Sequence, residues 1–79
     1  MELEKILGEE LRKIREEKGL SQEELGFKSD YHRTYISQIE RGQKSVSLKA
    51  VFKISDALEI VPSKLINSVE QRIYSVISV

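Results

Sequence analysis

The sequence predicts an all-α domain of five helices, and two observations lead to this fold class. Apolar residues recur three and four positions apart along most of the chain, which is the spacing of one helical face. Serine or proline precedes several of these stretches and glycine follows two of them, as expected where helices start and stop. A chain of 79 residues buries one small core. We therefore expect a single domain over residues 1–79, with its core in residues 8–66 and a short C-terminal extension in residues 67–79.

The first helix is expected over residues 3–18. Its apolar residues fall four, four and three positions apart and form one stripe: Leu3, Leu7, Leu11 and Ile14. Glu4 lies at the positive end of the helix dipole and Lys18 at the negative end, which is the favourable arrangement. Gly19 is suited to the position just after the last turn, so the helix is expected to end there.

Two short helices, over residues 22–28 and 33–41, are predicted on either side of a tight polar turn. The Ser21 hydroxyl can accept a hydrogen bond from a free amide of the first helix, and Glu24 completes a capping box. Gly26 stands where a side chain larger than a methyl group would hinder close approach of the second helix. By composition this stretch is a helix-turn-helix, and the rest of the chain is expected to support it.

The second of these short helices is amphipathic. Its inward face is expected to be apolar and consists of Tyr35, Ile36 and Ile39. Its other face offers five polar side chains: Arg33, Thr34, Ser37, Gln38 and Arg41. His32 is expected to cap its start, and Gly42 is expected to end it.

A fourth helix is predicted over residues 48–58, with Ser47 as its N-cap. It is largely apolar, through Leu48, Val51, Phe52, Ile54, Ala57 and Leu58. Lys49 and Lys53 are four residues apart, so they share one polar side of this helix and extend the basic surface beyond the helix-turn-helix.

The fifth helix is expected to start at Pro62, a residue favoured in the first helical turn. Val61 offers no capping side chain, so we expect this start to be weakly ordered. Residues 67–79 fit a helix, and residues 72–79 also fit a short strand because β-branched residues alternate there with polar ones. We favour a helix at a dimer interface, since so much apolar surface on a short tail needs to be covered.

The composition argues against several classes of protein. The chain has no cysteine, so it can form neither a disulfide nor a thiolate zinc site. His32 is the only histidine and is expected at a helix start, which leaves no base for a serine nucleophile and no metal site. We therefore expect no enzyme, no metal and no cofactor. No apolar run approaches the ~20 residues of a membrane span, and the acidic N-terminus lacks a signal peptide's pattern, so a soluble cytoplasmic protein without a membrane partner is expected.

The formal net charge of zero hides an uneven distribution. Residues 1–24 carry a net charge of −3, residues 25–53 carry +4, and residues 54–79 carry −1. The positive charge is therefore concentrated on the second half of the helix-turn-helix and on the segment after it. A basic patch of this kind favours a nucleic-acid partner.

The helix-turn-helix also resembles a known family. The spacing from Ser21 through Gly26 to Ile36 and Ile39 resembles that of the phage-repressor (Xre-type) helix-turn-helix family. The stretch HRTYISQIERG looks like the controller proteins of bacterial restriction-modification systems, which are small regulators within that family. The resemblance extends over roughly residues 8–66.

This resemblance implies a lambda-repressor-like DNA-binding domain that acts as a homodimer on double-stranded operator DNA. It also implies an ion pair between Arg15 and Glu40 that links the first helix to the recognition helix. Six residues are expected to contact the DNA backbone: Gln22, His32, Tyr35, Lys44, Ser45 and Lys49. Of these, the contacts of Lys44 and Ser45 depend most on the resemblance to controller proteins.

The first turns of the recognition helix are expected to read bases, through Arg33, Thr34, Ser37 and Gln38. An arginine can donate two hydrogen bonds to guanine, which discriminates by about 1–3 kcal/mol. A threonine offers a hydroxyl for a base edge and a methyl group for thymine. These donors favour direct base readout over a protein that binds only other proteins.

The leading interpretation is a homodimeric, sequence-specific transcriptional regulator, and its resemblance implies a restriction-modification controller protein. Such a protein activates at low dose and represses at high dose, and activation needs RNA polymerase, for which Glu23 and Glu24 are candidate contacts. A phage-type repressor and an antitoxin that regulates its own gene remain open within this class. A transcriptional bridging adaptor remains open outside it.

Overall fold

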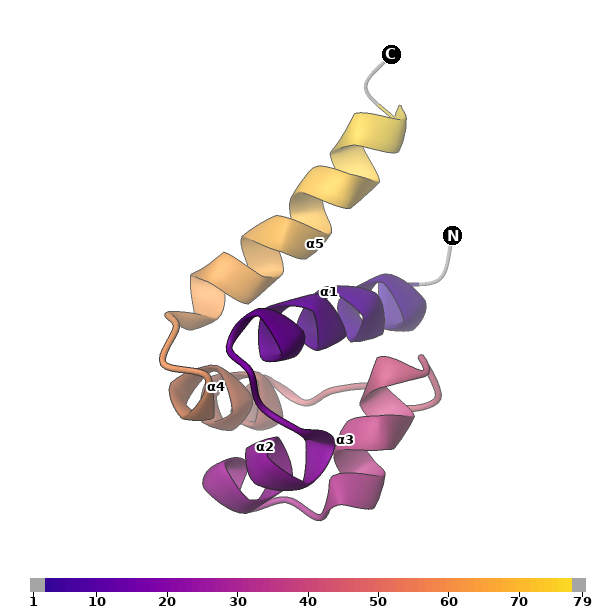
Figure 1. The fold of residues 1–79 in the computed structure, drawn as a ribbon. Coiled ribbons are helices and arrows are strands. Elements are labelled where there is room, and N and C mark those ends of the chain that lie inside the picture. Colours follow the sequence, from indigo (N-terminus) through magenta and orange to yellow (C-terminus); the bar gives the residue numbers. More distant parts are fainter. Residues whose placement is uncertain (1–2, 78–79) are drawn as a thin grey trace.

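The computed structural model describes the backbone of residues 3–77, and within these residues it contains five helices and no strand. The helices are α1 (Leu3–Glu17), α2 (Gln22–Ser29), α3 (Arg33–Glu40), α4 (Leu48–Ala57) and α5 (Pro62–Ile77) (Figure 1). The predicted all-α fold class is therefore confirmed. None of these helices is long and apolar enough to cross a membrane.

Side-chain caps account for the starts of α2, α3 and α4. The Ser21 hydroxyl accepts from the Glu24 amide at 3.0 Å and the Glu24 carboxylate accepts from the Ser21 amide at 2.9 Å, so the capping box is complete. The Ser47 hydroxyl accepts from the amide of Ala50 at 3.1 Å, and the imidazole of His32 caps α3. These local bonds satisfy amides that would otherwise lack a partner, and they fix the helix boundaries close to those predicted.

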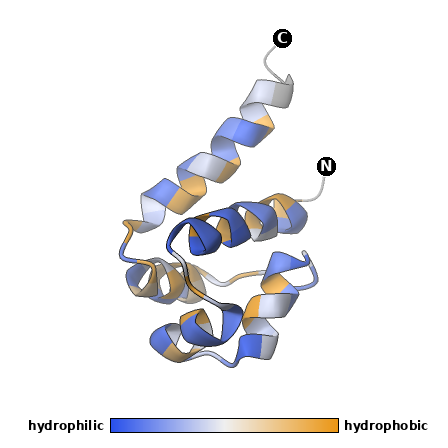
Figure 2. Cartoon of the chain, viewed as in Figure 1, coloured by the Kyte–Doolittle hydropathy of each residue, from blue (hydrophilic) through white to orange (hydrophobic). Residues whose placement is uncertain are grey.

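The core lies where the five helices meet, and α5 contributes Leu65 to it. Its largest fully buried hydrophobic side chains are Leu11, Leu25, Ile36, Ile39, Ile54 and Leu58. Each helix carries both hydrophobic and hydrophilic residues, as amphipathic helices do (Figure 2). The inner side of the helix-turn-helix is thus supported by the other helices: α3 packs on α1, while α2 packs on α4. The opposite side of α3 remains free for contact with another molecule.

Two glycines in contact with this core allow backbones to approach closely. A Cβ atom added at Gly26 would lie 2.6 Å from the carbonyl oxygen of Tyr31, so even a methyl group would clash. The sequence prediction that only a side chain larger than a methyl group would hinder the approach is therefore wrong. A Cβ atom added at Gly8 would lie 2.2 Å from the carbonyl oxygen of Ile39. Gly8 therefore sets the distance between α1 and the last turn of α3.

The predicted apolar surface of α4 is only partly buried. Val51, Ile54 and Leu58 are in the core, but Leu48 and Phe52 are 72% and 55% exposed. Leu48 and Phe52 are four residues apart and therefore share the side of α4 that points away from the core. The sequence pattern could not separate the two sides, because α4 carries apolar residues on both.

The tail forms a helix rather than a strand, because residues 67–77 continue α5 without a break; residues 78–79 lie outside the described part of the chain. The first turn is regular although Val61 provides no side-chain cap, since the Val61 carbonyl accepts from the amide of Lys64 at 2.9 Å. Further along, Arg72 bonds to Glu9 at 2.9 Å and to Glu10 at 3.1 Å, which ties α5 to α1. The far end of α5 projects beyond the other helices (Figure 1).

Candidate nucleic-acid interface

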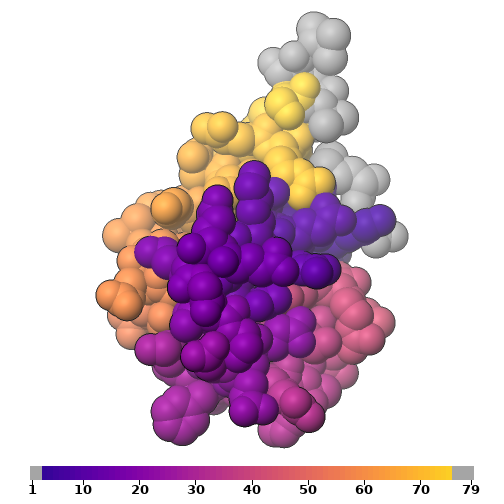
Figure 3. Space-filling model, in the orientation of Figure 1, coloured from indigo at the N-terminus to yellow at the C-terminus, as the bar shows by residue number. Residues whose placement is uncertain are grey.

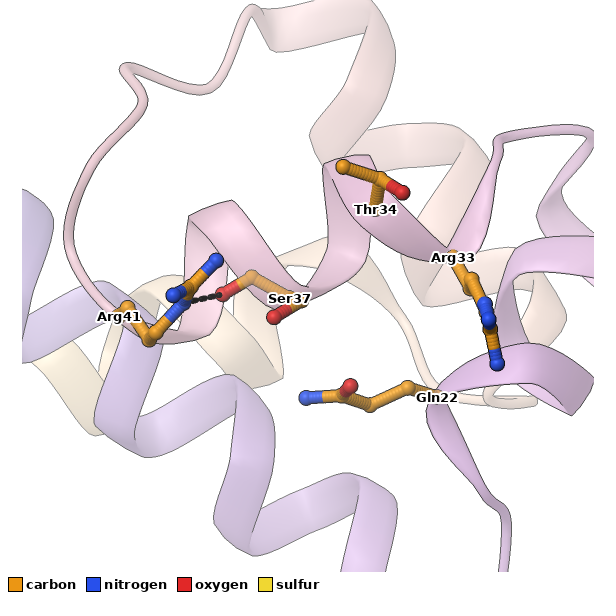
Figure 4. A pocket seen from close by; sticks show the side chains of 5 residues that line it. All are labelled: Gln22, Arg33, Thr34, Ser37 and Arg41. Carbon is orange, nitrogen blue, oxygen red and sulfur yellow. Dashed lines mark hydrogen bonds between the residues drawn. The ribbon is translucent and has the colours of Figure 1, made fainter.

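Five polar side chains line an open depression between the start of α2 and the outer face of α3: Gln22, Arg33, Thr34, Ser37 and Arg41 (Figure 4). Arg33, Ser37 and Arg41 are four residues apart along α3 and its C-cap, so they follow one another on the same side. The structure thus brings three of the four predicted base-reading residues together with one predicted backbone contact. An outward helix face that carries arginine, threonine and serine can donate to base edges and to phosphates.

Arg33 lies at the start of α3 and is well placed to move. Its side chain is 67% exposed, and its Nη1 atom lies 3.6 Å from a carboxylate oxygen of Glu23 on α2. An exposed ion pair of this length contributes little to stability, typically below about 1 kcal/mol. Arg33 can therefore exchange Glu23 for a base or a phosphate at small cost.

Arg41 joins the depression although it was not assigned a DNA contact from the sequence. Its Nε atom donates to the main-chain carbonyl of Ser37 at 3.4 Å, which folds the side chain back along α3. The signal was present in the spacing, because Arg41 follows Arg33 by eight residues, about two helical turns. It was overlooked because it stands at the helix end, where the direction of a side chain depends on the cap.

Gln38 and His32 lie outside the residues that line the depression. Gln38 is half-buried one position beyond Ser37. The Nδ1 atom of His32 accepts from the Thr34 amide at 3.0 Å, so His32 is the predicted cap and its other ring nitrogen carries the proton when the imidazole is neutral. That nitrogen is left as the atom that could reach a phosphate.

Tyr35 is half-buried and packs on Tyr31, with ring centroids 4.8 Å apart and ring planes inclined at 48°. Burial, together with the neighbouring Tyr31, raises the pKa of Tyr35 above its ordinary value. The hydroxyl of Tyr35 therefore keeps its proton at neutral pH and can act as a hydrogen-bond donor.

The lysines after the helix-turn-helix differ in their surroundings. Lys44 and Lys49 are exposed. The ammonium of Lys53 lies 4.5 Å from the centre of the Tyr31 ring and 3.7 Å from Asp30, so this lysine contacts the turn. It was predicted to extend the basic surface, but these contacts mean that it is not a free part of that surface. Ser45 is exposed and donates to Glu4 of α1 at 3.4 Å. The loop thus places Ser45 beside α1 rather than in the depression.

The predicted pair of Arg15 and Glu40 is present and buried. Arg15 donates from Nε to Glu40 Oε2 at 2.6 Å and from Nη2 to Glu40 Oε1 at 3.0 Å, and the side chains are 9% and 3% exposed. Arg15 also donates to the carbonyl of Leu20 at 2.7 Å. The hydrogen bonds with Glu40, together with the negative charge of Glu40, raise the pKa of Arg15 above its ordinary value. Gln22, expected only to touch the DNA backbone, also joins this pair: its Nε2 donates to Glu40 Oε1 at 3.0 Å.

Residues 3–77 hold no cluster of three histidine, cysteine or acidic side chains arranged to bind a metal. The site instead consists of the α2–α3 unit, which packs on α1 and α4, with the polar and partly basic face of α3 turned outward. A helix-turn-helix of this form defines the class of DNA-binding domains in which the second helix enters the major groove.

Comparison with known proteins places the chain within that class. It belongs to the helix-turn-helix family HTH_3, whose model matches residues 11–65. It is 49% identical over 63 residues to the control protein C.BamHI of Bacillus amyloliquefaciens, and the match covers 78% of each chain.

Solved structures give the same grouping. The crystal structure of the restriction-modification controller protein C.AhdI from Aeromonas hydrophila is 45% identical, with a TM-score of 0.77 over 78% of this chain and 94% of that one. The wild-type restriction-modification controller protein C.Esp1396I is 34% identical, with a TM-score of 0.84 over 92% of this chain and 94% of that one.

Proposed function

We propose that this protein is a sequence-specific DNA-binding transcriptional regulator, the controller protein of a restriction-modification system, and that it binds a two-fold symmetric operator as a homodimer. The observation that carries the DNA-binding part is the depression lined by Gln22, Arg33, Thr34, Ser37 and Arg41 on the open side of the helix-turn-helix. The controller assignment is supported by the similarity to C.BamHI and C.AhdI.

In this proposal α3 enters the major groove with its N-terminal turns foremost. Arg33 donates to a guanine, and Thr34 contacts a neighbouring base through its hydroxyl or methyl group. Ser37 and Gln38 reach base edges one turn further along. The backbone is held on either side by Gln22, Tyr35 and the exposed lysines Lys44 and Lys49, with His32 and Ser45 as further contacts at the helix start and in the loop.

A second copy of the chain is proposed to cover the outer side of α5. A groove there is lined by Leu3, Ile66, Val69, Glu70, Ile73 and Tyr74. Leu3, Ile66 and Tyr74 are 55%, 46% and 58% exposed, which is unusual for large apolar side chains gathered in one place. Figure 3 shows the described end of α5 above α1, at one end of the molecule. Two recognition helices related by a two-fold axis would then read half-sites about 34 Å apart.

Activation of transcription would require contact with RNA polymerase, and α2 is the proposed surface. Glu23 and Glu24 are exposed there beside Phe27, which is 88% exposed. Hydrogen bonds from the Ser21 cap lower the pKa of Glu24, so its carboxylate stays charged at neutral pH. A basic partner surface with an apolar element would fit this combination of charge and exposed ring.

Selection of bound duplexes from a random pool tests the proposal. We expect a two-fold symmetric motif with half-sites about one helical turn apart, present upstream of the chain's own gene and of an endonuclease gene. A motif without a neighbouring endonuclease gene would favour the phage-type repressor or the antitoxin. If no motif is enriched, base readout is refuted and a bridging adaptor that uses Phe27 becomes the better description.

A further inference from the structure

We infer that Glu40 is a positioning residue for DNA binding, because its buried carboxylate holds the side-chain amide of Gln22 at the depression, ready to donate to a backbone phosphate. This inference rests on the proposed function. It goes beyond it by assigning a binding role to an ion pair that otherwise only joins α1 to α3.

The first step is the orientation of the amide. A carboxylate can only accept hydrogen bonds, so Gln22 must turn its nitrogen, and not its oxygen, toward Glu40. The Nε2 atom donates to Glu40 Oε1 at 3.0 Å and uses one of its two N–H groups for this bond. The second N–H and the carbonyl oxygen of the amide remain. Figure 4 shows the Gln22 side chain lying below α3, with its amide between the positions of Arg33 and Arg41.

The second step is the rigidity of the carboxylate. Arg15 grips both oxygens of Glu40, at 2.6 and 3.0 Å, and is itself anchored to the carbonyl of Leu20 at 2.7 Å. A bidentate pair of this kind fixes the plane of the carboxylate as well as its place. The Gln22 amide is therefore fixed through Glu40 to Arg15 of α1.

The third step concerns energy and charge. A free surface glutamine would lose rotamer freedom when it bound a phosphate, whereas Gln22 has already lost part of that freedom in the folded protein. A lone carboxylate so close to DNA would also repel the phosphates, but the bidentate Arg15 compensates the charge of Glu40. The network thus presents a neutral donor in a fixed place.

A double-mutant comparison separates positioning from simple support of the fold. One variant is Gln22→Ala. The second is Arg15→Met/Glu40→Leu, which replaces the ion pair by apolar side chains and thereby avoids a buried unpaired charge. The third combines all three substitutions. Affinity is measured by fluorescence anisotropy at one salt concentration, on a duplex carrying the selected motif and on a random-sequence duplex of equal length, for variants whose circular dichroism shows a folded helical chain.

We expect Gln22→Ala to weaken binding to both duplexes roughly tenfold, the effect of one hydrogen bond to a charged group. The Arg15→Met/Glu40→Leu variant should lose part of this factor, because a Gln22 that is no longer held can still reach the phosphate, and the combined variant should lose no more than Gln22→Ala alone. Losses that multiply in the combined variant would show that Glu40 supports α3 independently of Gln22 and would overturn the inference. An unchanged affinity of Gln22→Ala would overturn it as well. If the wild-type chain binds neither duplex, the proposed function itself fails, which is a distinct result.

A measurement on the wild-type chain covers the case in which the ion-pair variant does not fold. Hydrogen exchange of the side-chain amide is followed by NMR for Gln22, with the exposed Gln43 as the control. We expect slowed exchange and a fixed pair of amide proton shifts at Gln22 only, with one of the two shifts moving when DNA is added. Equal exchange at the two glutamines would mean that Glu40 does not hold the amide in solution.

Discussion

Replacing Gly8 by alanine tests the packing that sets the position of the recognition helix. The added Cβ atom would lie 2.2 Å from the carbonyl oxygen of Ile39, 2.8 Å from that of Glu40 and 2.9 Å from the Glu40 carbonyl carbon. All three are main-chain atoms, so no flexible side chain can move aside. The helices α1 and α3 must separate by about 1 Å to restore ordinary contact distances.

The expected magnitude follows from two opposed effects. Overpacking of a well-packed contact costs about 1–3 kcal/mol, and a clash with backbone belongs near the upper end of that range. Alanine in place of glycine within a helix raises the free energy of unfolding by about 1 kcal/mol through its higher helix propensity, which offsets part of that cost. The net loss in the free energy of unfolding should therefore be about 2 kcal/mol. For a chain of this size that corresponds to a fall in Tm of about 8–16 °C.

Thermal unfolding followed by circular dichroism measures this loss, at one fixed protein concentration because dimer formation would make Tm depend on concentration. Gly19→Ala is the matched control. It adds the same methyl group at a position with no neighbouring atom within 4 Å, and its only cost is the positive φ of +73°. That cost is about 1–2 kcal/mol. DNA affinity adds a second criterion, since only Gly8→Ala should displace α3. A Gly8→Ala protein as stable as the wild type would refute the close approach of α1 and α3.

Three further substitutions test the site and the core. Arg33→Ala should cost about 1–3 kcal/mol of operator binding and relax the preference at one base position, measured on a panel of single-base operator variants; an equal loss on random DNA would contradict readout. Lys44→Ala should weaken binding to all sequences alike and reduce the slope of log affinity against log salt by about 0.9 for each phosphate that is no longer neutralised; a sequence-selective loss would argue for a base contact instead. Ser55→Ala should leave the free energy of unfolding unchanged or raise it by about 1 kcal/mol, because this fully buried hydroxyl has no partner within residues 3–77. Ser29→Ala is its control and should destabilise, since the Ser29 hydroxyl donates to a main-chain carbonyl at 2.7 Å.

Much of the fold could be predicted because its signals are local. The capping box of Ser21 and Glu24, the cap at Ser47 and the stop at Gly42 each depend on residues within a few positions of one another. The tail was ambiguous between helix and strand because its β-branched residues suit both. The structure resolves the ambiguity through contacts between distant residues, namely the burial of Val69 and the bonds from Arg72 to α1.

The candidate site was predictable in outline, but its contacts across the chain were not, apart from the ion pair of Arg15 and Glu40 that the family resemblance implied. Arg33, Thr34 and Ser37 followed from helical spacing alone, and they share the depression in the structure. The bond between Gln22 and Glu40 joins residues 18 apart, and no pattern along the chain indicates which polar groups meet at that separation. For the same reason Gly8 gave no signal, because the carbonyls that it approaches are more than 30 residues away in sequence.

The ion pairs of the structure explain how a chain of zero net charge can present a basic surface to DNA. Residues 25–53 contain two acids, Asp30 and Glu40, and both are paired, with Lys53 at 3.7 Å and with Arg15 at 2.6 Å. Arg15 comes from the acidic first part of the sequence, so its charge is brought to the site by folding and compensates Glu40 there. Three cations of this segment that form no ion pair within residues 3–77 therefore dominate this surface: Arg41, Lys44 and Lys49. Screening at physiological salt acts over about 8 Å, so a phosphate at this surface responds to these nearby charges rather than to the acids elsewhere on α1 and α5.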